Sequence, residues 1–138
     1  MDPASIAASA YALAGGIATC STAVTHFVRQ VKHARKDLDA INTELSATSE
    51  ILNPLVVSLI GNQGSPLPEA ILLTIDTSVR QCMSIVDRLK ADMDHYKRDA
   101  VWNKTKWVLF GEKNAQKARE NLEMHKVSLG LALQVLSL

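Results

Sequence analysis

Hydrophobic residues recur at alternating steps of three and four along the first 52 positions of the chain. This spacing places them on one face of an α-helix. They are Ile6, Ala10, Leu13, Ile17, Cys20, Val24, Phe27, Val31, Ala34, Leu38, Ile41, Leu45, Thr48 and Leu52. Asp2 followed by Pro3 is typical of a helix start, because a carboxylate accepts hydrogen bonds from free backbone N–H groups and proline is tolerated in the first turn. We therefore predict a helix that begins near residue 3.

This stripe is too long for one helix in a chain of this size. A helix through the whole stripe and up to the first loop would be about 85 Å long at about 1.5 Å per residue, and it would lack packing partners. Two break points compete: Gly15 and Gly16, which cost roughly 1 kcal/mol each inside a helix, and the polar residues 32–37. We favour the second, because Arg29 then lies in a last turn and Asp37 in a first turn, as both helix dipoles prefer.

The remaining pattern predicts three more helices. The second should run over about residues 37–59, with a kink at Pro54, and a loop over residues 61–68 should follow it. The third should start within residues 65–69, with Ser65 as its cap and the nearby prolines in its first turn. Its apolar stripe comprises Leu72, Ile75, Val79, Cys82, Val86, Leu89, Met93 and Tyr96.

The fourth helix should start near Glu112. Its stripe comprises Ala115, Ala118, Leu122, His125, Leu129, Ala132 or Leu133, and Leu136. A hydrophobic content of 47% with only 4% aromatic residues favours closely packed helices. We therefore expect an all-α, antiparallel four-helix bundle that forms one domain over residues 1–138, with room for a short extra helix between the third and fourth helices.

Residues that could carry chemistry are sparse. The sequence has no Gly-rich phosphate loop, no Cys-x-x-Cys and no His-Glu-x-x-His motif, and its histidines are scattered. His125 falls on an apolar stripe, where we interpret it as a neutral residue of the core. We expect no enzyme activity, no cofactor and no metal site, and a net charge of +1 gives no general attraction for nucleic acid.

The two cysteines indicate the cellular compartment. Cys20 and Cys82 both fall on apolar stripes, so free buried thiols are favoured over a disulfide. A reducing, cytosolic setting fits this usage. We expect no secretory signal, because Asp2 stands where a basic segment would be required.

The N-terminal segment is the most informative part of the chain. Residues 3–28 contain no Asp, Glu, Lys or Arg, and as a helix they could cross a hydrocarbon core of about 30 Å. The apolar residues that would drive insertion are Ile6, Tyr11, Leu13, Ile17, Val24 and Phe27, and the small residues that would allow close helix packing are Ala10, Ala14, Gly15, Gly16 and Ala18. The alternative is a central helix that the bundle surrounds. Both interpretations hold if a trigger releases a helix that is buried at rest.

Four basic residues follow this segment directly: Arg29, Lys32, Arg35 and Lys36. Basic residues next to an anionic leaflet contribute about 1 kcal/mol each to membrane binding, so this cluster is a candidate for contact with anionic lipid. The alternative is that these charges only stabilise the ends of the helices they flank.

Aromatic residues gather between the third and fourth helices. They are Trp102, Trp107 and Phe110, interleaved with Lys104 and Lys106. Such residues suit a membrane interface. Stacking on nucleic acid and packing of the connection onto the end of the bundle are the alternatives.

Several of these segments together resemble the HeLo-like N-terminal domain of fungal STAND and NLR-type proteins. They are the opening Met-Asp-Pro-Ala-Ser-Ile-Ala-Ala-Ser, the helix over residues 38–52, Trp107-Val-Leu-Phe-Gly-Glu, and Leu122-Glu-Met-His-Lys-Val-Ser-Leu-Gly-Leu-Ala-Leu. The family often has a proline at the end of its first helix, where this chain has Ala-Arg-Lys-Asp at residues 34–37. The four-helix domain of mixed-lineage kinase domain-like protein is similar.

The resemblance implies a bundle at the head of a larger receptor or amyloid-triggered effector in fungal non-self recognition, with no catalytic residues. Related domains act in programmed cell death by oligomerising and damaging the plasma membrane. We therefore expect a domain that is cytoplasmic at rest and moves to the plasma membrane on activation, with copies of itself, anionic lipids and an upstream NLR or amyloid-motif protein as partners. The alternative is a homotypic signalling module with no membrane activity.

Overall fold

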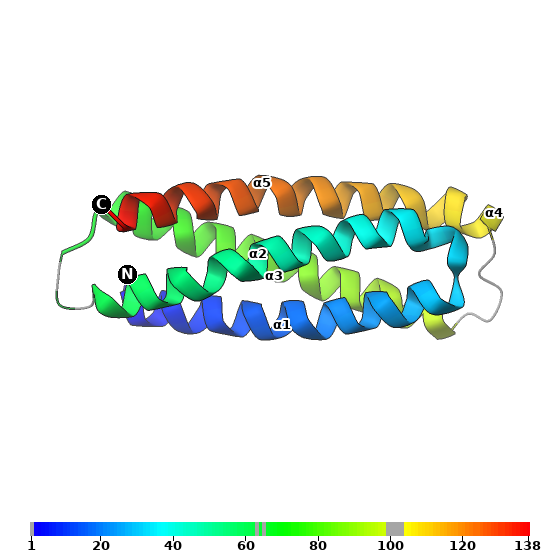
Figure 1. Ribbon diagram of the computed structural model, residues 1–138, viewed down its shortest axis with the longest axis horizontal. Coiled ribbons are helices and arrows are strands. Elements are labelled where there is room, and N and C mark those ends of the chain that lie inside the picture. Colours follow the sequence, from blue (N-terminus) through cyan, green and yellow to red (C-terminus); the bar gives the residue numbers. More distant parts are fainter. Residues whose placement is uncertain (1, 63, 65, 99–103) are drawn as a thin grey trace.

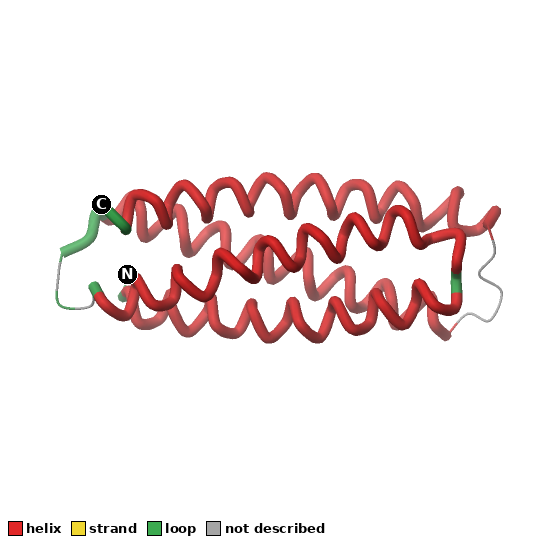
Figure 2. Tube along the Cα trace, viewed as in Figure 1, coloured by secondary structure: helices red, strands yellow, loops and turns green. Residues whose placement is uncertain are grey.

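The computed structural model describes residues 2–62, 64, 66–98 and 104–138, apart from the side chain of Phe110. The described residues form helices and short connections, with no strand among them (Figure 2). The long helices are α1 (Pro3–Gln30), α2 (Arg35–Gly61), α3 (Glu69–Arg98) and α5 (Glu112–Leu136). The short elements are the 3-10 turn η1 (Lys32–Ala34), α4 (Lys104–Lys106) and the π-helical turn η2 (Trp107–Gly111). The last two occupy the place where the sequence left room for an extra helix.

The four long helices pack against one another side by side (Figure 1). Helix α1 packs on α2 and α3, and α5 packs on the same two helices, so α1 and α5 lie on opposite edges of the bundle. Both chain ends and the loop after α2 lie at one end of the molecule, which we call the terminal end. The turns η1 and η2 and helix α4 lie at the opposite end, which we call the turn end.

The apolar stripes form the core, as the sequence predicts. Every position of the stripe from Ile6 to Leu52 is buried, and so is every position of the stripe along α3. The predicted helix start is also confirmed, because Asp2 caps α1 and its Oδ1 accepts a hydrogen bond from the Ala4 N–H at 3.2 Å. The polar break is correct as well, since Gly15 lies inside α1 and the helix ends at Gln30.

One detail around the prolines differs from the prediction. Helix α3 begins at Glu69, so Pro66 and Pro68 precede it instead of occupying its first turn. The Pro68 carbonyl still accepts the first backbone hydrogen bonds of the helix, from the N–H groups of Ile71 and Leu72 at 3.1 and 3.2 Å. Helix α2 continues past Pro54 to its last residue, Gly61, as predicted, and the kink at Pro54 stays a prediction. The predicted cap Ser65 lies outside the described residues.

Three buried groups behave as the sequence predicts. Cys20 and Cys82 are free and buried, and burial raises the pKa of their thiols to about 11 and about 12. Burial also lowers the pKa of His125, which favours the neutral imidazole in the core. These groups are therefore uncharged parts of the packing at neutral pH.

Candidate functional site

Helix α1 presents an uncharged outer face to solvent. That face carries Ala8, Ser9, Tyr11, Ala12, Gly15, Ala18, Thr19, Thr22, Thr25 and His26. The Thr19, Thr22 and Thr25 hydroxyls each donate a hydrogen bond to the carbonyl oxygen four residues earlier, at 3.1, 3.1 and 2.9 Å. Because these hydroxyls are already paired within the helix, moving them from water into lipid costs less than moving free hydroxyls.

Helix α1 is a corner helix and not a surrounded one. Among the described residues it is the one helix that is long and apolar enough to cross a membrane by length and composition. Only 33% of its most apolar 18-residue window is buried, so the interpretation as a helix enclosed on all sides is wrong. The helix has one face in the core and one uncharged face in solvent.

The residues expected to drive insertion lie mainly in the core. Ile6, Leu13, Ile17, Val24 and Phe27 are all buried, whereas Tyr11 is 75% exposed. Five of the six expected insertion residues are therefore unavailable to lipid while the bundle is closed. Contact between these five side chains and a hydrocarbon core would require α1 to leave α2 and α3.

The small residues of α1 do not form one packing surface. Ala10 is buried, and a Cβ atom on Gly16 would lie 3.5 Å from the Met83 sulfur, so both face the interior of the bundle. Gly15 and Ala18 face solvent, and a Cβ atom on Gly15 would meet nothing within 4 Å. Ala14 is half-buried between the two groups. The closed bundle therefore divides these residues between its interior and its surface, and their role in close helix packing stays a prediction.

The polar contacts that hold α1 are neutral. The Ser21 hydroxyl donates to Asn42 Oδ1 on α2 at 3.0 Å, and the Asn42 side-chain amide donates to the Thr25 hydroxyl at 3.3 Å. In the part of the chain that the structure describes, no ion pair joins α1 to another helix. The rest of the contact between α1 and the bundle is apolar packing.

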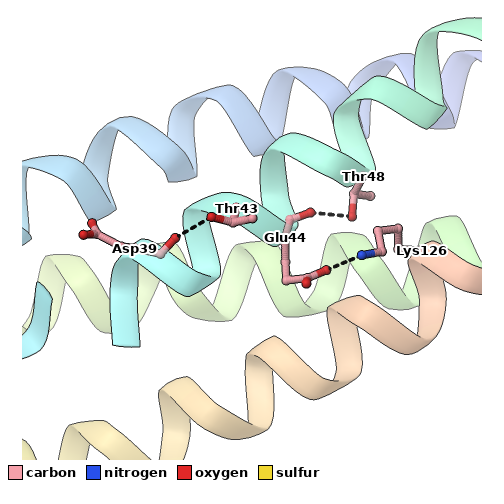
Figure 3. Close-up of polar contacts among 5 residues, drawn as sticks. All are labelled: Asp39, Thr43, Glu44, Thr48 and Lys126. Atoms are coloured by element: carbon pink, nitrogen blue, oxygen red, sulfur yellow. Dashed lines mark hydrogen bonds and ion pairs between the residues drawn. The ribbon is translucent and has the colours of Figure 1, made fainter. Parts of the chain in front are cut away.

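The contact between α2 and α5 includes an ion pair, unlike the described contacts of α1. Lys126 Nζ on α5 lies 2.8 Å from Glu44 Oε2 on α2, and both side chains are mostly shielded from solvent (Figure 3). The Thr48 hydroxyl donates to the Glu44 carbonyl at 2.8 Å, beside a similar bond from Thr43 to the Asp39 carbonyl at 3.0 Å (Figure 3). The contact between α2 and α5 therefore includes a charged interaction, whereas the polar contacts of α1 described above are neutral.

An aromatic cluster of Phe27, Tyr96 and Trp107 closes the turn end. The Trp107 ring centroid lies 6.0 Å from that of Phe27 on α1 and 6.5 Å from that of Tyr96 on α3. Its indole N–H donates to Asp37 Oδ2 on α2 at 2.9 Å. One residue thus links η2 to three of the long helices. A Cβ atom on Gly111 would overlap the Trp107 ring, so glycine is required there.

This cluster corrects the expectation of interfacial aromatics. Trp107 is only 2% exposed, so it packs the connection onto the bundle, as the alternative interpretation held. Trp102 and the side chain of Phe110 lie outside what the structure describes. Of the apolar side chains of η2 that the structure describes, Val108 and Leu109 reach solvent and are 53% and 65% exposed.

The turn end is rich in exposed basic residues. Arg29, Lys32, Arg35 and Lys36 are all exposed, as contact with anionic lipid would need. The fold adds the end of α3 and helix α4 to the same end of the molecule (Figure 1). We define the basic end as Arg29, Lys32, Arg35, Lys36, Lys97, Arg98 and Lys104. The last three were missed as members because they are more than 60 positions from the others in sequence.

The terminal end has the opposite character. Residues 3–28, 51–68 and 127–138 contain no Asp, Glu, Lys or Arg. The start of α1, the end of α2 and the end of α5 lie together at this end, beside the start of α3, which carries Glu69 and Asp76 (Figure 1). Exposed apolar side chains accompany them, among them Tyr11, Val57, Ile60, Leu131 and Val135. Charge is therefore segregated along the length of the bundle, which the local sequence of any one helix does not reveal.

Comparisons with protein-family models, with curated proteins and with solved structures found no match. Among the described residues, no group of three or more His, Cys, Asp or Glu side chains is placed to hold a metal ion.

Proposed function

We propose that this chain is an antiparallel four-helix bundle of the HeLo-like kind. Its function would be that of a membrane-targeting, oligomerising cell-death execution domain in a fungal NLR-type receptor or amyloid-triggered effector. The observation that carries the proposal is the position of α1, whose uncharged outer face leads directly into the basic end. The domain is cytoplasmic at rest and moves to the plasma membrane on activation.

The first step is docking of the basic end. Its seven basic residues face an anionic leaflet, where each contributes about 1 kcal/mol at close approach. Val108 and Leu109 project from the same end and can enter the interfacial region. Clustering of several copies multiplies these modest contributions, because linked domains bind at a high effective concentration.

The second step is release of α1. Its five buried insertion residues each gain about 1.5–3 kcal/mol from burial, so release into water is unfavourable. Release into lipid keeps these side chains out of water, and the outer face brings no charge into the hydrocarbon. The basic residues after Gln30 remain with the head groups. This step does not break the ion pair between Glu44 on α2 and Lys126 on α5.

Dye leakage from vesicles tests this function. We expect the purified domain, clustered through a fused oligomerising tag, to permeabilise vesicles that contain phosphatidylserine and to leave purely zwitterionic vesicles intact. The unclustered domain should bind the same anionic vesicles with little leakage. Absence of both binding and leakage for the clustered domain would contradict the proposal.

A specific observation supports the alternative of a homotypic interaction module. Met124, Val127, Leu131 and Val135 are exposed at steps of three and four on the outer face of α5, which no other described helix covers. Such a stripe suits a protein partner. Self-association of the clustered domain without vesicle leakage would favour this alternative.

A further inference from the structure

A groove runs between α1 and α3 in the half of the bundle nearer the basic end. Its cavity has a volume of about 510 Å³, within the range of about 300–1,000 Å³ that is typical of small-ligand sites. The floor is apolar and includes Phe27 and Met93. The α3 side carries Lys90, Asp94 and Lys97.

These three charged residues form an ordered pattern along α3. Their spacing of four and three residues places them on one face, about 6 Å and about 4.5 Å apart along the helix axis. The order of charge is positive, negative, positive. Within the described residues, none of the three has an ion-pair partner at 4.0 Å or less. Both lysines would attract a simple anion, but Asp94 would repel it. A ligand whose charged groups follow the order negative, positive, negative would be attracted by all three residues.

We propose that this groove binds the phosphoserine head group of phosphatidylserine. Phosphate and carboxylate would contact Lys90 and Lys97, and the ammonium group between them would contact Asp94. Phe27 and Met93 would contact the glycerol and the first acyl carbons. The inference rests on the proposed function, because it assumes that the domain meets an anionic membrane, and it names the lipid that the membrane must contain.

The position of the groove also orders the events at the membrane. Both walls are needed, so the site exists only while α1 is packed on α3. A ligand that binds only the closed bundle stabilises it. Head-group binding therefore belongs to the docked, closed state, before α1 is released.

A soluble lipid tests the site without a bilayer. We expect dihexanoyl phosphatidylserine to bind the full chain about fivefold more tightly than dihexanoyl phosphatidylglycerol, which carries the same net charge but no ammonium group. Titration calorimetry below the micelle concentration gives the two affinities, and the serine lipid should also raise the melting temperature. In Asp94→Asn the two lipids should bind with about equal affinity. Removing a negative charge should strengthen the binding of both anionic lipids, so a lost preference for the serine lipid is distinct from a general effect of charge. The control Glu123→Gln makes the same charge change on α5 and should keep the preference.

Equal affinities for the two lipids in the unmodified chain would overturn the inference, and so would an undiminished preference in Asp94→Asn. The first comparison needs no variant, so it does not depend on how Asp94→Asn folds. Lipid preference without vesicle leakage would refute the proposed function alone. Leakage without lipid preference would refute this inference alone.

Discussion

We expect reversal of Arg29, Lys32, Arg35 and Lys36 to glutamate to lower the affinity for phosphatidylserine vesicles by about a thousandfold or more. Each residue contributes about 1 kcal/mol at an anionic surface, and about 1.4 kcal/mol corresponds to a tenfold change. Loss of four such contributions therefore accounts for about three orders of magnitude, and the introduced acids add repulsion. Vesicle co-sedimentation measures the effect.

A second set of four reversals controls for net charge. Arg80, Arg88, Lys117 and Arg119 are exposed along the sides of the bundle and are not members of the basic end, although Arg119 lines a cavity together with Lys36. Reversing them changes the net charge by the same amount, yet we expect less than a tenfold loss of affinity, because these residues are farther from a membrane docked at the turn end. Circular dichroism should show both variants to be folded. Equal losses in the two sets would mean that total charge, and not the basic end, determines binding.

We expect Trp107→Ala to lower the free energy of unfolding by about 3–5 kcal/mol, as is usual when a buried large aromatic side chain is removed. The substitution also leaves Asp37 without its indole donor and removes the ring that contacts Phe27 on α1. Urea unfolding followed by circular dichroism gives the loss. Because the cluster fixes the end of α1, the same variant should release dye from anionic vesicles faster than the unmodified chain.

Two milder variants separate the parts of this cluster. Trp107→Phe keeps an aromatic ring but removes the N–H donor, so it should lower the free energy of unfolding clearly less than Trp107→Ala does.

Gly111→Ala should be destabilising because its methyl group displaces the Trp107 ring. Gly15→Ala, where the methyl group meets nothing, should instead stabilise α1 by up to about 1 kcal/mol. A loss below about 1 kcal/mol for Trp107→Ala would show that the cluster does not hold the bundle closed.

Local pattern was sufficient to predict the helices and their core. Every position that the steps of three and four identified from Ile6 to Leu52 is buried, because periodicity reports which face of a helix is apolar; the stripe omitted the buried Ala7 and Val28 beside it. The change from basic to acidic residues located the break that η1 fills, because the charges complement two helix ends. These signals lie within one or two turns of the residues they describe.

The candidate site depended on which helices become neighbours, and no local signal carries that information. The outer face of α1 could be assigned only once α1 was seen to pack on two helices. Lys97 joins Lys32 at one end only because α1 and α3 pack side by side and end there. Trp107 was expected at a membrane interface because its amphipathic ring suits one. In the fold its indole N–H donates to Asp37, which is 70 positions away in sequence, so the local sequence carries no sign of this partner.

The central claim is that α1 must leave the bundle for the membrane to be breached, and a covalent tether tests it most directly. The Ser21 hydroxyl oxygen on α1 and Asn42 Oδ1 on α2 lie 3.0 Å apart, so Ser21→Cys combined with Asn42→Cys places two thiols on facing positions of the two helices, where mass spectrometry first confirms that the disulfide has formed. The native thiols should not compete at pH 8, since burial raises the pKa of Cys20 to about 11 and that of Cys82 to about 12.

The measurement is dye leakage from phosphatidylserine vesicles by the clustered double variant, before and after reduction, with the unmodified chain treated identically. We predict that the oxidised variant binds the vesicles as tightly as the unmodified chain but releases almost no dye, and that reduction restores leakage. Equal leakage from the oxidised and reduced forms would contradict the account, because the membrane would then be breached with α1 still fixed to α2.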